Sequence, residues 1–162
     1  MFARSSHARR RASLRFAVLA ALAVAVIGAA SLPAFAAATS GPAKVHVVTN
    51  AKLGHMLVGP NGHTLYIFLK DTGPKSTCYG TCAKYWPPLL TQGKPVALAG
   101  AKQALLGTTK RTNGTVQVTY DKKPLYYFLE DKKPGDTKGE GLNLSGAKWY
   151  AIGPGGGKID KG

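Results

Sequence analysis

Short hydrophobic segments alternate with turn residues between positions 44 and 153 of the chain. The segments are rich in β-branched and aromatic side chains, which favour strands, and Gly, Pro and Asn stand between them. Asn61-Gly62 and Asn113-Gly114 suit the positive φ angles of tight hairpin turns. We therefore predict a mostly β domain, an antiparallel sandwich or small barrel. The predicted strands are 44–49, 55–58, 64–69, 108–112, 116–120, 125–129 and 149–152.

Helical patterns are confined to two short stretches, 82–85 and 96–106, so the prediction includes one or two short helices. Residues 37–43 and 154–162 consist largely of small residues without periodicity. Such segments are typical of loops and linkers, and we expect a flexible leader and a flexible tail. One domain over residues 44–153 remains.

The hydrophobic pattern occurs twice. LYIFLKD at 65–71 recurs as LYYFLED at 125–131, and AKYW at 83–86 recurs as AKWY at 147–150. A second match after a loop of different length is improbable by chance. We infer two imperfect copies of one supersecondary unit, near residues 55–90 and 114–153.

The repeated segment has two bulky faces. Alternate residues of a strand share a face, so Leu65, Ile67 and Leu69 lie on one side and the aromatic residues on the other. We expect a central strand that is covered on both sides. Asp71 and Asp131 stand where each strand ends, and we expect them to accept hydrogen bonds from loop amides. The predicted core aromatics are Tyr66, Phe68, Trp86, Tyr126, Phe128 and Trp149.

The N-terminal segment follows a different pattern. Arginines without an acidic residue precede an uncharged apolar run over 16–30, and Ala34-Phe35-Ala36 follows a proline. This order is typical of a secretory signal peptide, which we predict over residues 1–36 with cleavage near Ala36. We expect a secreted or cell-envelope protein with no stable transmembrane span after cleavage. No cysteine near the cleavage site could carry a lipid anchor.

Removal of the signal leaves 17 basic residues against 7 acidic ones, a net charge of +10. Lysine carries nearly all of this charge, which favours contact with polyanions such as anionic envelope polymers. Specific recognition of nucleic acid favours clustered arginine forks, and Arg111 is the only arginine left after cleavage. We therefore expect no specific nucleic-acid partner.

Cys78 and Cys82 are the only cysteines. In an oxidising compartment such a pair predicts a disulfide, and Gly80 gives the three-residue spacer the freedom to turn. Two alternatives stay open. The pair could be a redox couple if it were strained or exposed. Its thiolates could also bind a soft metal ion together with His55 and His63, which flank a predicted hairpin.

Known catalytic motifs are absent from the sequence. It contains no Gly-x-Ser-x-Gly, no His-Glu-x-x-His and no phosphate-binding glycine loop. We therefore predict no catalytic residues. Trp86 and Trp149 could form a platform for a sugar ring or a quinone-like ligand, but only if their rings were exposed.

These residues resemble a known bacterial family. The repeated Tyr-x-Phe-x-x-Asp, together with Cys78…Cys82 and Trp86-Pro87-Pro88-Leu89, resembles the secreted-repeat family of predicted lipoproteins with a Tyr-x-(Phe/Trp/Tyr)-x-x-Asp motif. The resemblance covers roughly residues 50–155 and implies an exported, two-copy, mostly β domain of unknown function. The chain lacks the lipid-attachment cysteine of the lipoprotein members. We interpret it as an exported binding or structural module; the alternatives are a redox or soft-metal protein centred on the cysteines and a polyanion-binding surface protein.

Overall fold

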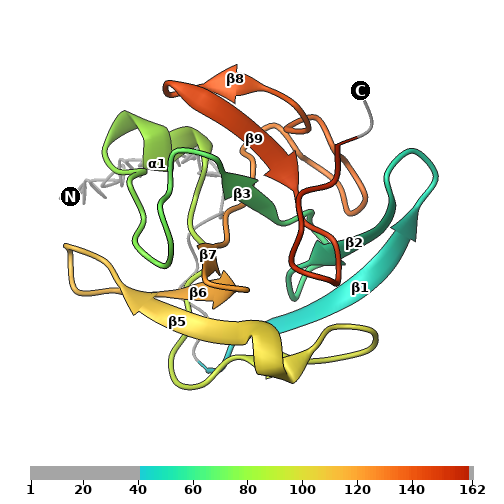
Figure 1. Cartoon of the computed structure of the whole chain (residues 1–162), viewed down its shortest axis with the longest axis horizontal. Helices are drawn as coiled ribbons and strands as arrows, with labels where there is room; N and C mark the ends of the chain where they lie inside the picture. Colours follow the sequence, from blue (N-terminus) through green and yellow to red (C-terminus); the bar gives the residue numbers. More distant parts are fainter. Residues whose placement is uncertain (1–40, 161–162) are drawn as a thin grey trace, which may run out of the picture. The chain divides into compact units, whose positions relative to one another are not determined.

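The computed structural model describes residues 41–160 (Figure 1). The predicted signal peptide and residues 37–40 of the leader lie outside the described residues, as do residues 161 and 162. One α-helix, α1 (Thr81–Tyr85), and a 3₁₀ turn at Gln103–Leu105 accompany the strands. The strands are β1 (Lys44–Asn50), β2 (Gly54–Val58), β3 (Tyr66–Phe68), β4 (Val96–Ala97), β5 (Leu106–Lys110), β6 (Val116–Tyr120), β7 (Lys123–Pro124), β8 (Asn143–Leu144) and β9 (Ala147–Ala151).

The strands form three small sheets, with the orders β2-β1-β4, β3-β9-β8 and β5-β6-β7. Every pairing within these sheets is antiparallel except that of β1 with β4. The mostly β fold predicted from the pattern is confirmed. Within residues 41–160 the strands do not close into a barrel. No helix in this part of the chain is long and apolar enough to cross a membrane.

The two copies exchange strands. In the first copy, β3 pairs with β9 of the second, in a register that places Ile67 opposite Tyr150. In the second copy, segment 125–129 runs beside 85–89 of the first, where the Leu129 amide donates to the Tyr85 carbonyl at 2.8 Å. Each copy therefore completes the other, and these interleaved elements occupy the centre of Figure 1.

The exchanged segments meet at two tyrosines. The Tyr66 amide donates to the Tyr126 carbonyl at 2.8 Å, and the Tyr126 amide donates to the Tyr66 carbonyl at 3.0 Å. This reciprocal pair joins equivalent positions of the two copies, because Tyr66 and Tyr126 occupy the same place in the repeated sequence.

The two faces of β3 border two different cores, as a central strand requires. Leu65 and Ile67 belong to one hydrophobic cluster, with Val118, Leu125 and others. Tyr66 and Phe68 belong to a second cluster. Leu69 departs from the prediction, because β3 ends at Phe68 and the Leu69 side chain is 49 % exposed.

Two predicted elements differ from the structure. Segment 125–129 is not a regular strand and forms only isolated bridges at Tyr126. Its neighbours Pro87 and Pro88 have no amide hydrogen to donate, which interrupts a regular ladder. The predicted helix over 96–106 is wrong: this stretch holds β4, a loop, the 3₁₀ turn and the start of β5. Gly100 lies in its middle with φ 78°, which no α-helix can accommodate.

Both ends of the described region pack against the domain. The buried Ala43 donates its amide to Thr91 Oγ1 at 2.9 Å. At the other end, the Ile159 amide donates to the Ala151 carbonyl at 2.8 Å, and Lys158 pairs with Ile152. Composition alone, which indicated flexible ends, gave no sign of these contacts.

Candidate functional site

Two tyrosine–aspartate pairs cross between the copies. Tyr66 Oη donates to Asp131 Oδ2 at 2.6 Å, and Tyr126 Oη donates to Asp71 Oδ2 at 2.6 Å. Each phenol thus binds the carboxylate of the other copy. The repeated motif Tyr-x-Phe-x-x-Asp therefore encodes a reciprocal bond as well as a strand.

Each aspartate also holds its own loop with its second oxygen. The Thr77 amide donates to Asp71 Oδ1 at 2.7 Å, and the Lys138 amide donates to Asp131 Oδ1 at 2.9 Å. These loop contacts match the role expected of the two carboxylates. Sequence reasoning missed the bonds to the tyrosines, although the joint repetition of Tyr and Asp was a signal for them.

Four aromatic rings stack in a column beside these pairs. Trp86 and Trp149 lie face to face, with ring centroids 3.9 Å apart and an interplanar angle of 2°. Phe68 stacks on Trp149 at 4.1 Å, and Phe128 stacks on Trp86 at 4.3 Å. We call Phe68, Trp149, Trp86 and Phe128 the aromatic column. Each copy supplies one phenylalanine and one tryptophan. Along the column, rings of the first copy alternate with rings of the second.

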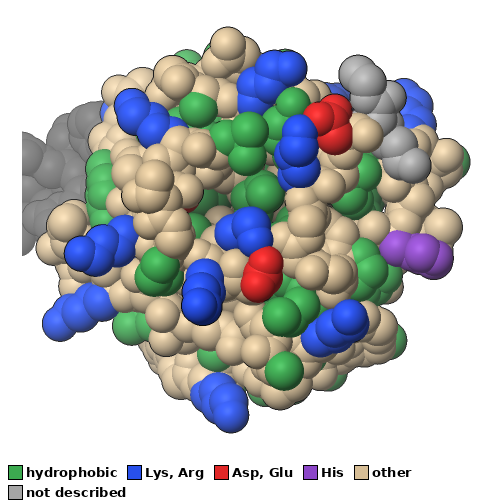
Figure 2. Space-filling model, in the orientation of Figure 1, with side chains coloured by type: hydrophobic (Ala, Val, Ile, Leu, Met, Phe, Trp, Pro, Cys, Tyr) green, Lys and Arg blue, Asp and Glu red, His purple; other side chains and the backbone are tan. Residues whose placement is uncertain are grey.

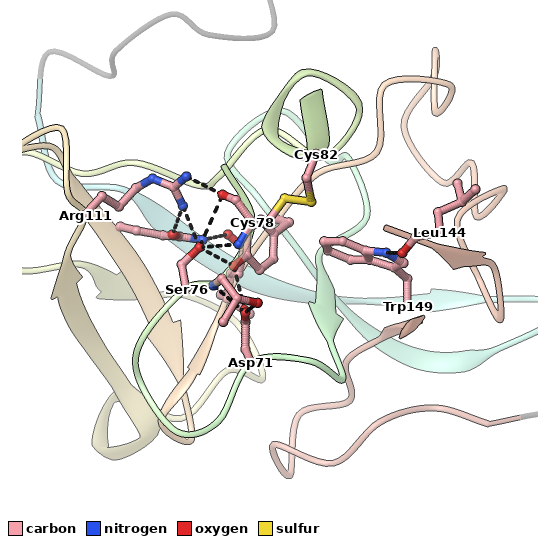
Figure 3. The surroundings of a disulfide bond; sticks show 11 residues. Asp71, Ser76, Cys78, Cys82, Arg111, Leu144 and Trp149 are labelled. Atoms are coloured by element: carbon pink, nitrogen blue, oxygen red, sulfur yellow. Dashed lines mark hydrogen bonds between the residues drawn. A yellow bond between two sulfur atoms is a disulfide. The ribbon is translucent and has the colours of Figure 1, made fainter. Parts of the chain in front are cut away.

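The paired tyrosines contact the column edge-on. Tyr66 meets Trp86 with centroids 5.4 Å apart, and Tyr126 meets Trp149 at 5.1 Å. All six rings are buried. The platform alternative needed exposed tryptophans, and these rings are not available to a sugar or quinone from outside. Trp149 Nε1 donates to the Leu144 carbonyl at 2.9 Å (Figure 3), whereas Trp86 Nε1 is buried without a hydrogen-bond partner.

Burial sets the protonation of this site. It raises the pKa of the Asp131 carboxyl, and the hydrogen bond from Tyr66 only partly opposes this effect. Burial, followed by the nearby carboxylate charge, raises the pKa of the Tyr66 and Tyr126 phenols far above the usual range. At neutral pH both phenols are therefore proton donors. Glu140, whose pKa burial also raises, accepts from the Ala151 amide at 2.7 Å.

The predicted disulfide between Cys78 and Cys82 is present. Arg111 anchors its loop (Figure 3): one guanidinium nitrogen donates to the Cys78 carbonyl at 2.6 Å, and the other donates to Gln117 Oε1 at 2.6 Å. The guanidinium also lies 4.4 Å from the centroid of the Tyr79 ring. Arg111 is only 4 % exposed, so the single arginine within residues 41–160 serves the interior. The only hint in the sequence was that Arg111 is the single arginine outside the predicted signal peptide.

Ser76 connects the disulfide loop to one of the crossed pairs. Its Oγ accepts from Arg111 Nη1 at 2.9 Å and lies 2.8 Å from Tyr126 Oη. Tyr126 in turn donates to Asp71. A continuous polar chain therefore runs from the arginine to the carboxylate on this side, whereas the Tyr66–Asp131 pair has no arginine beside it.

The candidate metal ligands are not gathered. His55 is exposed on β2, with Nδ1 3.1 Å from Thr49 Oγ1, and His63 meets the edge of the Tyr127 ring with centroids 6.5 Å apart. The cysteine sulfurs are joined, so thiolates exist only in a reduced form. Within residues 41–160, no three His, Cys, Asp or Glu side chains lie together in an arrangement that could hold a metal ion.

The acidic side chains of the described region are all engaged. Asp71, Asp131 and Glu140 accept the internal hydrogen bonds given above. The other four form ion pairs with lysines. Those pairs are Asp121–Lys123, Glu130–Lys132, Asp136–Lys138 and Asp160–Lys158.

Most lysines have no such partner. Of the fifteen in residues 41–160, only those four form an ion pair with a carboxylate, and the other eleven are exposed. Figure 2 shows lysines spread over one face, with few acidic side chains between them. The eleven unpaired lysines are Lys44, Lys52, Lys70, Lys75, Lys84, Lys94, Lys102, Lys110, Lys122, Lys133 and Lys148.

Comparison with known proteins identifies the repeat. A search of curated proteins and a search of solved structures found no match. A family model described as a secreted repeat of unknown function matches residues 47–90 and 107–152, more than half of the chain. Each match contains one Tyr-x-Phe-x-x-Asp segment and starts earlier than the predicted copies, because it includes most of β1 or β5. The chain therefore belongs to this family of secreted repeats of unknown function.

Proposed function

We propose that this protein is an exported, non-enzymatic module that attaches to anionic polymers of the cell envelope through its lysine-rich surface. The eleven unpaired lysines carry the proposal. Because every carboxylate of the described region is bonded inward or paired with a lysine, the free surface charge is positive.

The distribution of the lysines suits a polymer better than a compact ligand. They occur on several strands and on the loops between them, and Figure 2 shows them spread rather than gathered in one pocket. A long polyanion can contact many dispersed cations at once, and each contact releases bound counterions. The single arginine is buried, which leaves no exposed guanidinium fork in residues 41–160 for reading bases.

The interior supports a structural role in the same module. The crossed Tyr–Asp pairs and the aromatic column join the two copies, so the lysines of both copies belong to one framework. A rigid surface loses little conformational entropy when a polymer binds.

The experiment is a binding titration of the purified full-length protein with inorganic polyphosphate and with polygalacturonate at a series of salt concentrations. We expect binding to both polymers, with an association constant that falls steeply as salt rises. Binding that does not change with salt, or no binding at low salt, would contradict the proposal.

A pair of neighbouring lysines provides the matched variants. Lys70 follows β3, and the Leu69 amide donates to the carbonyl of Lys148 on β9. The variant Lys70→Gln/Lys148→Gln should bind more weakly and show a shallower salt dependence than the wild type. Lys70→Arg/Lys148→Arg keeps both charges and should bind as the wild type does. If both variants bound alike, the lysine charges would not be the cause.

A further inference from the structure

The crossed tyrosines and the aromatic column form an arrangement that polymer binding does not use. Two indoles stack at 3.9 Å, and each contacts a tyrosine whose hydroxyl already donates to a carboxylate. Indole and phenol are the side chains most easily oxidised by one electron when no thiol is free, and the described region has no free cysteine. We propose that this core is a redox site, which takes up one oxidising equivalent from an external one-electron oxidant and holds it as a neutral radical on Tyr66.

The first step is loss of an electron from the tryptophan pair. The face-to-face stacking of Trp86 and Trp149 lets both rings share the positive charge that remains, and Phe68 and Phe128 cover the outer faces. The rings are buried, so the electron leaves by tunnelling to an oxidant at the surface. A domain of this size has a radius of gyration of about 14 Å, which keeps the column within tunnelling reach.

The second step moves an electron and a proton from Tyr66. The electron passes to the oxidised indole of Trp86, whose ring Tyr66 meets edge-on. The phenolic O–H bond breaks, and a new O–H bond forms on Asp131 Oδ2 across the 2.6 Å hydrogen bond. That distance is within the range for direct proton transfer. The net change is one electron lost to the oxidant, with the proton retained on the aspartate.

The charge balance of the core drives this second step. Before it, the interior holds an indole radical cation and the Asp131 carboxylate; after it, both groups and Tyr66 are neutral. Buried charges are costly in a region of low dielectric constant, so their removal is favourable. Burial also raises the pKa of the Asp131 carboxyl, which makes its carboxylate a better proton acceptor for the Tyr66 phenol.

The two tyrosines are not equivalent in this respect. Asp71 accepts from the Thr77 amide and the Thr77 hydroxyl in addition to Tyr126, whereas Asp131 accepts only from Tyr66 and the Lys138 amide. Tyr126 Oη also lies beside Ser76, which binds the Arg111 guanidinium, and this positive charge opposes oxidation. The geometry therefore assigns the radical to Tyr66. An electron from a reductant of the ascorbate or quinol class, with return of the proton from Asp131, restores the starting state.

Flash photolysis tests the proposal on the full-length protein. Ruthenium tris-bipyridine with persulfate generates the one-electron oxidant, and transient absorption and electron paramagnetic resonance distinguish indole from phenoxyl radicals. We expect an indole signal that decays as a phenoxyl signal grows, and slower growth in D₂O because a proton moves in the same step. An indole signal that never converts, or phenoxyl growth at the same rate in D₂O, would overturn the proposal.

Variants locate the radical. Tyr66→Phe should lose most of the slow phenoxyl signal, and Tyr126→Phe, its matched control, should keep most of it. Asp131→Asn retains Tyr66 but removes the proton acceptor, and it should also lose most of this signal. Near-ultraviolet circular dichroism, which reports the packed aromatic rings, checks that each variant is folded. Equal yields in folded Tyr66→Phe and wild type would assign the phenoxyl to a surface tyrosine such as Tyr85 and refute the site.

Discussion

At the scale of single residues, each aspartate of the repeated motif carries two tasks. One oxygen of Asp131 accepts from the Lys138 amide of its own loop, and the other accepts from Tyr66 of the other copy. Asp71 does the same with Thr77 and Tyr126. A short carboxylate is suited to this because it has two acceptor oxygens and no donor. The aspartate of the motif therefore stabilises both its own loop and the contact between the two copies.

The two crossed hydrogen bonds differ in burial, so the loss of each should lower the free energy of unfolding by a different amount. Tyr66→Phe leaves an oxygen of Asp131, which is 1 % exposed, without its phenol donor. We expect the free energy of unfolding to fall by about 1–3 kcal/mol, the usual cost of an unsatisfied buried polar group. Tyr126→Phe should cost about 1 kcal/mol, because Asp71 is partly exposed and keeps Thr77. Denaturant titration measures both; equal losses would show that burial does not distinguish the pairs.

The raised pKa of Asp131 predicts a pH dependence of stability. In the folded state this carboxyl binds its proton more tightly than in the unfolded chain, where its pKa is near the ordinary value of 3.8. The contribution of Asp131 to the free energy of unfolding is therefore greatest below that value and is lost as the pH rises through the raised pKa. Glu140 acts in the same direction from its ordinary value of 4.5. The lowered pKa of the half-exposed Asp121 acts weakly in the opposite direction.

Asp131→Asn isolates this contribution. The free energy of unfolding of the variant, measured by denaturant titration at several pH values from acid to neutral, should decrease less with rising pH than that of the wild type. An identical pH profile in both proteins would mean that Asp131 has the same pKa in the folded and unfolded chain.

Gly139 shows how closely the column is packed. A Cβ added at this position would lie 2.8 Å from the Trp86 ring and 2.9 Å from the Tyr66 ring. Gly139→Ala should lower the free energy of unfolding by about 1–3 kcal/mol through overpacking. Gly155→Ala is the matched control, because nothing lies within 4 Å of its Cβ position and its φ is not left-handed. Thermal unfolding compares the stability of the two variants. A Gly139→Ala variant as stable as the wild type would disprove the tight contact.

At the scale of elements, the sequence predicted most strands because alternation and turn residues are local signals. β1, β2, β6 and α1 lie within one residue of the predicted ranges. The residues of segment 125–129 are themselves typical of a strand. Its irregularity depends on Pro87 and Pro88, which only the fold places opposite it. The helix predicted over 96–106 failed because Gly100 adopts a positive φ against Val47 of β1.

The candidate site shows the same division. The buried aromatic residues and the two loop-binding aspartates followed from the repeat itself. The hydrogen-bond partner of each tyrosine could not be predicted, because the order of residues does not reveal that strands of the two copies pair with each other. The role of Arg111 was missed for the same reason: its partners Ser76 and Cys78 come from the other copy.

The disulfide loop is a further element with a measurable effect. The bond between Cys78 and Cys82 closes a small ring, for which the chain-entropy model gives a stabilisation of about 2 kcal/mol. Cys78→Ser/Cys82→Ser should therefore lower the melting temperature and leave polyphosphate binding unchanged, since Arg111 still holds the loop through the Cys78 carbonyl position. Loss of polyphosphate binding in the folded variant would instead place the disulfide in the binding surface.

At the scale of the whole molecule, the exchange of strands makes the two copies interdependent. β9 of the second copy completes the sheet of β3 of the first, and the column takes a tryptophan and a phenylalanine from each. Neither copy buries its own aromatic residues alone. The proposed attachment surface depends on this shared core, because it holds the backbone that carries the lysines of both copies in one framework.

Hydrogen–deuterium exchange of the native protein tests that interdependence most directly. The slowest amides of the β1–β2 hairpin report opening of the first copy, and those of the β5–β6 hairpin report opening of the second. If each copy completes the other, both sets should exchange with the same free energy of opening, and Tyr66→Phe should lower both equally. Different opening free energies, or a loss confined to one hairpin, would show that the two copies fold independently and would contradict the account.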